Sequence, residues 1–225
     1  MLDEPIKKQS LQKIVRETLR QAILEREIEP GGQININRVA EKLGVSAMPI
    51  REALRELEAE GMVTFSSNKR ILASRLSRSE LYDIYSIRIP LEEIALTKFL
   101  NLNDKRGLDD LEAFHRQMLK PRITGKDWFH LNRSFHMKLY EMSGSERLFK
   151  ILQGLWNNTG PYLRIFSDNK KAVARANEEH GLLLQALRKR NSKQAQEVLK
   201  KHLQNGIRTI ELSLDGGEGK TNSLK

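Results

Sequence analysis

Hydrophobic residues early in the chain follow two helical repeats that are separated by a tight turn. Val39, Ala40 and Leu43 share one face of a first short helix. Gly44 can then take the left-handed backbone that ends a helix, and Ser46 stands where its hydroxyl can cap a second one. The order of short helix, tight turn and second helix predicts a helix-turn-helix.

The second helix of this motif has two distinct faces. Its apolar residues recur at helical spacing and are expected to face a core, namely Ile50, Ala53, Leu54 and Leu57. The outer face is left to Ala47, Met48, Arg51, Glu52 and Arg55. Because the second helix of a helix-turn-helix enters the major groove of DNA, we expect the outer face to contain the base and phosphate contacts.

Flanking patterns extend the motif on both sides. An amphipathic helix is predicted before it from Leu11, Ile14, Val15, Leu19, Ala22 and Ile23, ending at Pro30-Gly31-Gly32. After it, Val63 and Phe65 predict one strand, Ile71 and Ala73 its partner, and Ser66–Arg70 the turn. From Gly61 to Ser79 there is no acidic residue, while Lys69, Arg70, Arg75 and Arg78 are basic. We predict a wing that lies along phosphates; the alternative is an ordinary solvated hairpin.

The rest of the chain has a helical pattern throughout. Ser77 to Ser79 can cap a helix that starts near Glu80, and no strand is predicted up to residue 213. Breaks near Asn101–Asp104, Pro121–Gly125, Ser143–Ser145, Ser167–Lys170 and Arg190–Ser192 divide this region into six helices. The expected domains are therefore a winged helix-turn-helix over residues 1–75, an all-α bundle over 76–213, and a disordered tail over 214–225.

Composition supports a globular protein and adds limits on its location. The chain has 225 residues, of which 39% are hydrophobic, which is enough for two small cores. There is no cysteine, no signal peptide and no apolar run long enough to cross a membrane, so we expect a cytoplasmic protein. The net charge is +10, but residues 1–75 hold 13 Lys or Arg against 11 Asp or Glu. Net charge is therefore weak support for DNA binding, and the helix-turn-helix spacing is the main argument.

Residues 10 to 75 resemble the winged helix-turn-helix of GntR-type bacterial transcription regulators. The matching signature is Gly44-Val45-Ser46, Pro49, Arg51-Glu52-Ala53-Leu54 and Leu57, while Asn37, Ala47, Met48 and Arg70 depart from the usual pattern. The resemblance implies contacts to phosphate or base edges from Ser46 and Arg51, with Arg38 substituting for its neighbour Asn37. The predicted DNA-binding residues are Arg38, Ser46, Ala47, Met48, Pro49, Arg51, Arg55, Lys69 and Arg70. The alternative for Arg51 is an ion pair within its helix, with Glu52 or Glu56.

Three histidines lie on the inward stripes of three different predicted helices. His136 shares a face with Asn132, His180 lies in line with Ala176 and Leu183, and His202 lies among Val198, Leu199 and Leu203. A single histidine on an apolar face is more often hydrogen-bonded in a core than bound to metal, and His115 has the same kind of pattern. The pattern alone therefore leaves both interpretations open.

Roughly residues 77 to 213 resemble the FadR C-terminal domain (FCD), the helical sensor of one GntR subfamily. The resemblance rests on Arg88 and Glu92, on Asn132, Phe135 and His136, on Ser143-Gly144, on Glu179-His180, and on His202-Leu203. It implies one divalent metal bound by Asn132, His136, His180 and His202. Neutral imidazoles with one oxygen donor suit zinc, nickel, manganese or iron(II). Asn132 stands where the family usually has Asp, and the loss of that negative charge should lower the affinity or change the metal preference.

The same resemblance implies a small carboxylate effector held between the metal and Arg88. Arg88 lines up with the apolar residues of its helix, and a buried guanidinium needs a partner. The alternative is an internal ion pair with Glu92, Glu93 or another acid of the bundle. Further candidates for the effector site are Arg133, Tyr162 and Arg164. Trp128 and Trp156 fit core or dimer packing better than a ligand platform.

Together these patterns and the two resemblances predict a homodimeric, ligand-responsive transcription regulator and not an enzyme. The winged helix would bind an inverted-repeat operator in double-stranded DNA, and the bundle would sense a small organic acid, with repression as the default hypothesis. One alternative is an architectural or constitutive DNA-binding dimer whose bundle only dimerises. The other is a metalloenzyme fused to a DNA anchor, but no general base or nucleophile is identifiable near the histidines.

Overall fold

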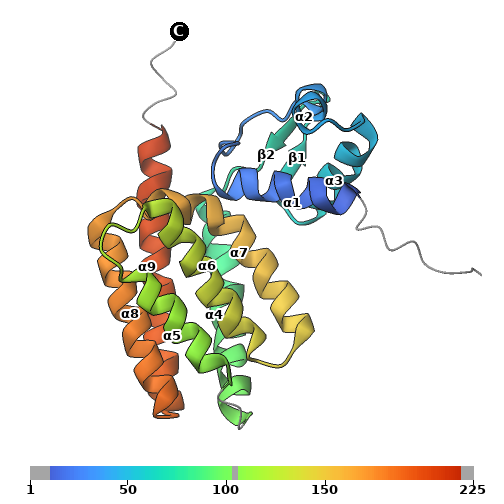
Figure 1. Cartoon of the computed structure of the whole chain (residues 1–225). Coiled ribbons are helices and arrows are strands. Elements are labelled where there is room, and N and C mark those ends of the chain that lie inside the picture. Colours follow the sequence, from blue (N-terminus) through green and yellow to red (C-terminus); the bar gives the residue numbers. More distant parts are fainter. Residues whose placement is uncertain (1–10, 103–105, 219–225) are drawn as a thin grey trace, which may run out of the picture. The chain divides into compact units, whose positions relative to one another are not determined.

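The computed structural model describes residues 11–102 and 106–218, which form two compact units with a boundary between Arg75 and Leu76. In these residues the first unit has three helices and a hairpin, and the second has six helices (Figure 1). The predicted fold class, a winged helix-turn-helix followed by an all-α bundle, is confirmed. Every helix of the described residues is too short or too polar to span a bilayer.

The first unit is built around the predicted helix-turn-helix. Its elements are α1 (Leu11–Leu24), α2 (Ile36–Leu43), α3 (Ala47–Ala59), β1 (Val63–Phe65) and β2 (Ile71–Ala73). Helix α3 packs against α1 and α2, and its predicted inward residues Ile50, Ala53, Leu54 and Leu57 are all fully buried. Burial of such aliphatic side chains stabilises a fold by roughly 1.5–3 kcal/mol each, so this stripe fixes which face of α3 stays outside.

The turn between α2 and α3 confirms one prediction and corrects another. Gly44 has φ 65°, in the left-handed region, and the Val45 N–H donates to the Ala40 carbonyl at 3.1 Å. Ser46 does stand at the N-cap of α3, but its side chain makes no capping hydrogen bond. It is exposed, so water can satisfy the first amides of α3 instead. The side-chain cap within the motif is instead at the start of α2, where Asn35 accepts a hydrogen bond from the Arg38 N–H at 3.1 Å.

Helix α1 ends earlier than the sequence predicted. It stops at Leu24, well before Pro30, because Arg26 turns the chain with a left-handed φ of 62°. The Ile28 N–H then donates to the Ala22 carbonyl at 3.0 Å, which satisfies one of the last carbonyls of the helix. The proline and glycines that follow mark the loop beyond this closure and do not cause it.

The predicted wing is an antiparallel hairpin. Its register pairs Val63 with Ala73 and Phe65 with Ile71. The turn closes through a hydrogen bond of 2.8 Å from the Ser66 N–H to the Arg70 carbonyl, with Lys69 at a left-handed φ of 60°. The turn therefore presents Lys69 and Arg70 as exposed neighbours at its tip.

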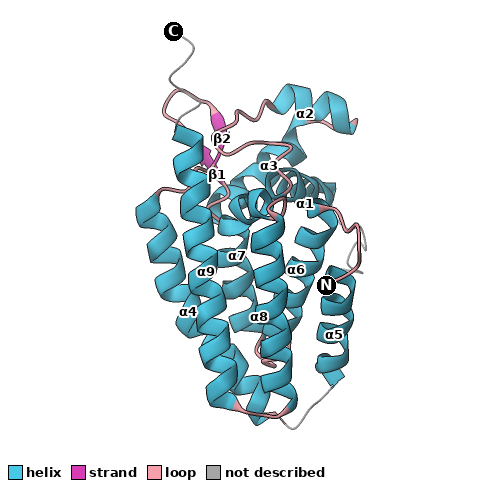
Figure 2. Cartoon of the chain, turned by 90° about the vertical axis from the view of Figure 1, so that its left-hand side faces the viewer, coloured by secondary structure: helices cyan, strands magenta, loops and turns pink. Residues whose placement is uncertain are grey.

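Over the residues that the structure describes, the second unit is a bundle of six helices, as the predicted breaks implied (Figure 2). The helices are α4 (Arg78–Asn101), α5 (Arg106–Met118), α6 (Gly125–Glu141), α7 (Glu146–Phe166), α8 (Lys170–Arg188) and α9 (Ser192–Glu218). Helix α9 packs against α4, α7 and α8, and α5 packs against α6 and α8. Ser77 caps α4 as predicted, in a reciprocal capping box with Glu80. Residues 103–105, between α4 and α5, lie outside the described residues.

The predicted start of the tail at residue 214 is wrong, because α9 continues to Glu218. Two glycines in this segment argued for a helix end at residue 213. Each glycine costs only about 1 kcal/mol in a helix and does not forbid it. Residues 219–225 lie outside the described residues, so the remainder of the predicted tail is a prediction still.

Candidate functional site

The outer face of α3 forms a convex, exposed surface. Met48 is 65% exposed, and Ser46, Arg51 and Arg55 are also exposed. Ala47 and Pro49, in the first turn of the helix, are half-buried. The charged and polar part of the face that the sequence left for base and phosphate contacts is therefore exposed within its own unit.

Arg51 makes no ion pair within the described residues. Of the two acids proposed as its alternative partners, Glu56 is held by Arg16 and Gln12 of α1. Glu52 is exposed, and the structure shows no ion pair between it and Arg51. The guanidinium of Arg51 therefore has its hydrogen-bond donors available for an anionic or carbonyl group outside the protein.

The remaining basic candidates lie on α2 and on the wing. Arg38 is exposed on α2, and Lys69 and Arg70 are exposed at the tip of the hairpin. Like Arg51 and Arg55, these three make no ion pair with any residue the structure describes. Exposed cations without acidic partners are suited to phosphate contacts, which also release bound counterions from DNA.

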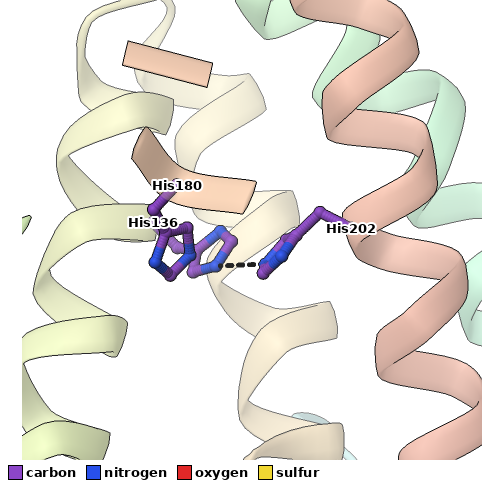
Figure 3. Close-up of side chains that lie close together, drawn as sticks. All are labelled: His136, His180 and His202. Atoms are coloured by element: carbon purple, nitrogen blue, oxygen red, sulfur yellow. Dashed lines mark hydrogen bonds between the residues drawn. The ribbon is translucent and has the colours of Figure 1, made fainter. Parts of the chain in front are cut away.

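In the second unit, three helices bring three histidines together. His136 of α6, His180 of α8 and His202 of α9 each offer a ring nitrogen, and these nitrogens all lie within 4.8 Å of one another. Figure 3 shows the three rings converging from separate helices, with the Nε2 atoms of His136 and His202 3.3 Å apart. The three histidines that the bundle brings together are the same three that the family resemblance indicated.

Several buried polar atoms at this cluster lack a hydrogen-bond partner in the described structure, although Nδ1 of His136 lies 3.9 Å from Oε2 of Glu92. They are both ring nitrogens of His180, Nδ1 of His136 and Oδ1 of Asn132. Buried polar atoms are nearly always hydrogen-bonded, because leaving one unpaired costs about 1–3 kcal/mol. Three imidazoles are a common donor set for a divalent metal ion, and the amide oxygen of Asn132 is a further oxygen donor. The residues therefore fit the metal that the resemblance implies.

Two of these histidines are held in the neutral form. Burial, reinforced by the neighbouring His202, keeps the pKa of both His136 and His180 well below its ordinary value. Neutral imidazole is the form that coordinates metal, so neither ring has to lose a proton first at neutral pH.

His202 is oriented by an acid that the sequence analysis did not select. Nδ1 of His202 lies 2.8 Å from Oε2 of Glu179, and Asn205 donates to the other oxygen of this carboxylate. Burial opposes ionisation of Glu179, but these hydrogen bonds outweigh it and lower the pKa of the carboxyl group. A carboxylate on one nitrogen directs the other toward a metal, as is common around metal-binding histidines. The sequence signal that could have identified Glu179 as a site residue was its position directly before His180.

Arg88 belongs to a buried network next to the cluster. Its Nε donates to Oε1 of Glu92 at 2.6 Å, and its Nη2 donates to the Tyr140 hydroxyl at 3.1 Å. Tyr85 and Thr159 accept longer bonds from Nη1, both 3.3 Å. Burial alone disfavours the charge on Arg88, but Tyr140 and Glu92 outweigh it and raise its pKa. The internal ion pair with Glu92, which the sequence left open as an alternative, is what the structure contains.

A small cavity connects Arg88 with the histidine cluster. Its volume is about 40 Å³, enough for an ion and a few small ligand atoms. Its polar wall consists of Tyr85, Arg88, Asn132, His136, Arg175, Glu179, His202 and Asn205. His180 reaches the cluster from behind this wall, fully buried.

The other residues predicted for the effector site do not line this cavity. Arg133 stacks on Trp156, with its guanidinium carbon 5.6 Å from the ring centre. The Tyr162 hydroxyl accepts from the Leu76 N–H at 2.6 Å, and Arg164 pairs with Asp168 at 3.0 Å. Of the four predicted residues, the structure therefore places only Arg88 beside the histidines.

The remaining aromatic and histidine predictions concern residues near the cluster. His115 bonds the Asn177 carbonyl through Nε2 at 2.9 Å and is not one of the three converging histidines. Trp128 and Trp156 are almost fully buried, as expected for core residues. Trp128 also donates from its indole nitrogen to Asn177 at 2.8 Å, so its one polar atom is satisfied.

Comparison with known protein families gives one match in each unit. The family model described as "Bacterial regulatory proteins, gntR family" matches residues 11–72. The model described as "FCD domain" matches residues 83–205, which is more than half of the chain. The first match spans the helix-turn-helix and wing, and the second spans the histidine cluster.

Individual relatives agree with these matches over most of their length. An uncharacterized HTH-type transcriptional regulator of Bacillus subtilis, YdhC, is 29% identical over 91% of this chain and 92% of its own. The HTH-type transcriptional repressor GlaR of Escherichia coli is 23% identical over 88% of this chain and 94% of its own. The solved structure of E. coli McbR/YncC matches with a TM-score of 0.79 at 21% identity, covering 91% of this chain and 99% of that one. At that identity the structural match shows a shared fold.

Proposed function

Since the chain belongs to the GntR family of bacterial regulatory proteins and carries an FCD domain, we propose that this DNA-binding transcription regulator is a homodimeric repressor that senses a small organic acid beside a metal ion. The prediction of a regulator and not an enzyme is confirmed by the family and by the relatives. The observation that carries the sensing half of the proposal is the cluster of three converging histidines with unpartnered nitrogens.

In the proposed DNA complex, α3 enters the major groove and the wing lies along the phosphates. Arg51 is assigned the main contact, supported by Ser46, Met48 and Arg55 from the same face, because these residues are exposed. Arg38, Lys69 and Arg70 are assigned to phosphate. A single recognition helix contacts few bases, so a two-fold dimer on an inverted repeat would double the specific contacts.

The wing assignment predicts a loss of salt-dependent affinity. Lys69→Ala and Arg70→Ala should each weaken binding to operator and to unrelated DNA by a similar factor. The slope of log affinity against log salt should become shallower by about 1 for each phosphate contact removed. Fluorescence anisotropy over a range of salt concentrations measures this slope. Lys98→Ala, which removes an exposed charge from α4, should leave it unchanged, and an unchanged slope in both wing variants would rule out the wing as a phosphate contact.

The proposed metal site consists of Asn132, His136, His180 and His202. Zinc, nickel, manganese and iron(II) all accept this combination of imidazoles and one neutral oxygen. When bound, the metal would supply a positive centre that attracts a carboxylate. Glu179 would hold the His202 ring in place, and burial keeps the other two imidazoles neutral.

Metal analysis tests this site directly. Purified protein is expected to contain about one equivalent of a divalent metal per chain, because three converging imidazoles still supply most of the ligands of such a site. His180→Ala should lose most of it, whereas His115→Ala, a histidine of the same bundle outside the cluster, should retain it. Mass spectrometry of acid-digested protein gives the metal content. If wild-type protein reconstituted with each candidate metal and then desalted retains none, the metal half of the proposal is wrong.

Repression relieved by a ligand requires two states with different ligand affinities. An acid that binds the DNA-incompetent arrangement more tightly would shift the equilibrium away from the operator complex. Deleting the gene should therefore raise expression of a reporter placed behind the operator.

A dimer through the bundle is supported by Ile87 and Ile94 on α4, which are 51% and 48% exposed and lie two turns apart on one face.

Two observations favour the alternative of a constitutive or architectural dimer. Arg88 is already paired with Glu92, and Asn132 brings no negative charge to the metal site. In that case the bundle would only dimerise. Operator affinity that is unchanged by chelator and by carboxylic acids would favour this alternative, while a change with either would favour the sensor.

A further inference from the structure

The cavity beside the histidines has a second arginine in its wall, and this arginine differs from Arg88 in its surroundings. Arg88 is 1% exposed and is paired with Glu92. Arg175 of α8 is exposed, and its guanidinium donates only one long hydrogen bond, 3.4 Å, to the Thr209 hydroxyl. The guanidinium of Arg88 is therefore occupied by partners within the protein, whereas most of the N–H donors of Arg175 are available to a ligand.

The nearest acid of the wall does not neutralise Arg175 by direct contact. Both oxygens of Glu179 are already engaged, one by His202 and the other by Asn205. No carboxylate of the described part of the chain lies within ion-pair distance of Arg175. Its guanidinium consequently retains the planar, two-pronged set of donors that matches a carboxylate.

Arg175 also lies where the cavity meets solvent, since it lines the cavity and is exposed. Gly206 of α9 also lines the cavity. A Cβ atom at Gly206 would lie 3.2 Å from the Tyr85 hydroxyl, so a side chain there would narrow the cavity beside Tyr85. An anion approaching from solvent would therefore meet Arg175 before it reached the buried Arg88.

We propose that Arg175, and not Arg88, binds the carboxylate of the effector. This inference rests on the proposed function as a sensor of an organic acid. Binding a carboxylate to Arg88 would require competition with Glu92 in a buried network, whereas binding to Arg175 replaces water and one long hydrogen bond. Arg88 then serves to hold the wall of the cavity in place through Glu92 and Tyr140.

Calorimetric titration of the full-length, metal-reconstituted protein with acetate, lactate, succinate and citrate tests the assignment. At least one of these acids is expected to bind the wild type. Arg175→Gln should weaken that binding by about 10- to 150-fold, the range for losing hydrogen bonds to a charged group. Arg175→Lys should retain part of the affinity as a point charge. Arg208→Gln removes the same charge from exposed α9 outside the cavity wall and should have little effect.

The outcomes separate this inference from the proposed function. Unchanged acid binding in Arg175→Gln would overturn the role of Arg175 and leave the sensor proposal standing. An equal loss in Arg208→Gln would also overturn it, because the effect would then be one of general charge. If none of the four acids binds the wild type, both the inference and the effector half of the proposed function are wrong.

Discussion

Arg51→Ala is expected to lower operator affinity by about 30-fold or more. Arg51 is exposed on α3 and has no ion-pair partner in the described residues, so it is free to make a two-pronged contact to a guanine edge. Such a contact contributes about 1–3 kcal/mol, and the proposed dimer makes it twice. The operator is first identified by selection from random DNA, and affinity is then measured by anisotropy at fixed salt.

Two comparisons make the Arg51 test specific. Arg147→Ala removes an exposed charge from α7 of the second unit and should leave operator affinity nearly unchanged. Binding of Arg51→Ala to unrelated DNA should fall less than its binding to the operator, because a base contact contributes to specificity and a phosphate contact does not. Equal operator affinity of Arg51→Ala and the wild type would refute the assigned role.

Arg88→Met is expected to destabilise the protein by about 3–5 kcal/mol. The substitution removes the cation but leaves Glu92, whose side chain is fully buried, without its charged partner. Tyr140 would still donate to this carboxylate at 2.7 Å, but one hydroxyl compensates a buried charge only in part. Urea denaturation in the presence of chelator measures the change in the free energy of unfolding without a contribution from metal.

The double variant Arg88→Met/Glu92→Met serves as the control for this mechanism. Replacing both members of a buried pair by apolar residues is often nearly neutral, so the double variant should recover most of the lost stability. Arg188→Met, which breaks an exposed ion pair with Glu112, should cost far less than Arg88→Met. A double variant as unstable as Arg88→Met alone would show that shape and hydrogen bonding, and not the unpaired charge, dominate at this site.

The parts of the fold that follow from local pattern were predictable from the sequence. The stripe from Ile50 to Leu57 and the left-handed turn at Gly44 depend only on helical period and on glycine's backbone freedom. The ends of α1 and α9 were not predictable in the same way. Arg26 takes a left-handed conformation that arginine does not favour, and α9 continues through two glycines because its earlier turns pack against three other helices.

The site was predictable only in outline, because pairing between helices is not written in any single helix. Inward position and family resemblance selected His136, His180 and His202. Neither could show that Glu179 would reach His202, since that contact depends on how α8 and α9 are rotated within the bundle. The pairing of Arg88 with Glu92, four residues apart on α4, was open to the sequence only as one of several alternatives. Arg175 had no periodic signal at all, because it lies on the exposed side of α8 and lines the cavity from its edge.

The conformation of Lys69 sets backbone strain against positive charge at the tip of the wing. A left-handed backbone costs a residue with a side chain about 1–2 kcal/mol, and glycine would avoid that cost. Glycine would also remove the cation assigned to the phosphates. Natural variation at this position can therefore favour a more stable hairpin or a stronger contact with the DNA phosphates, but a single residue cannot maximise both.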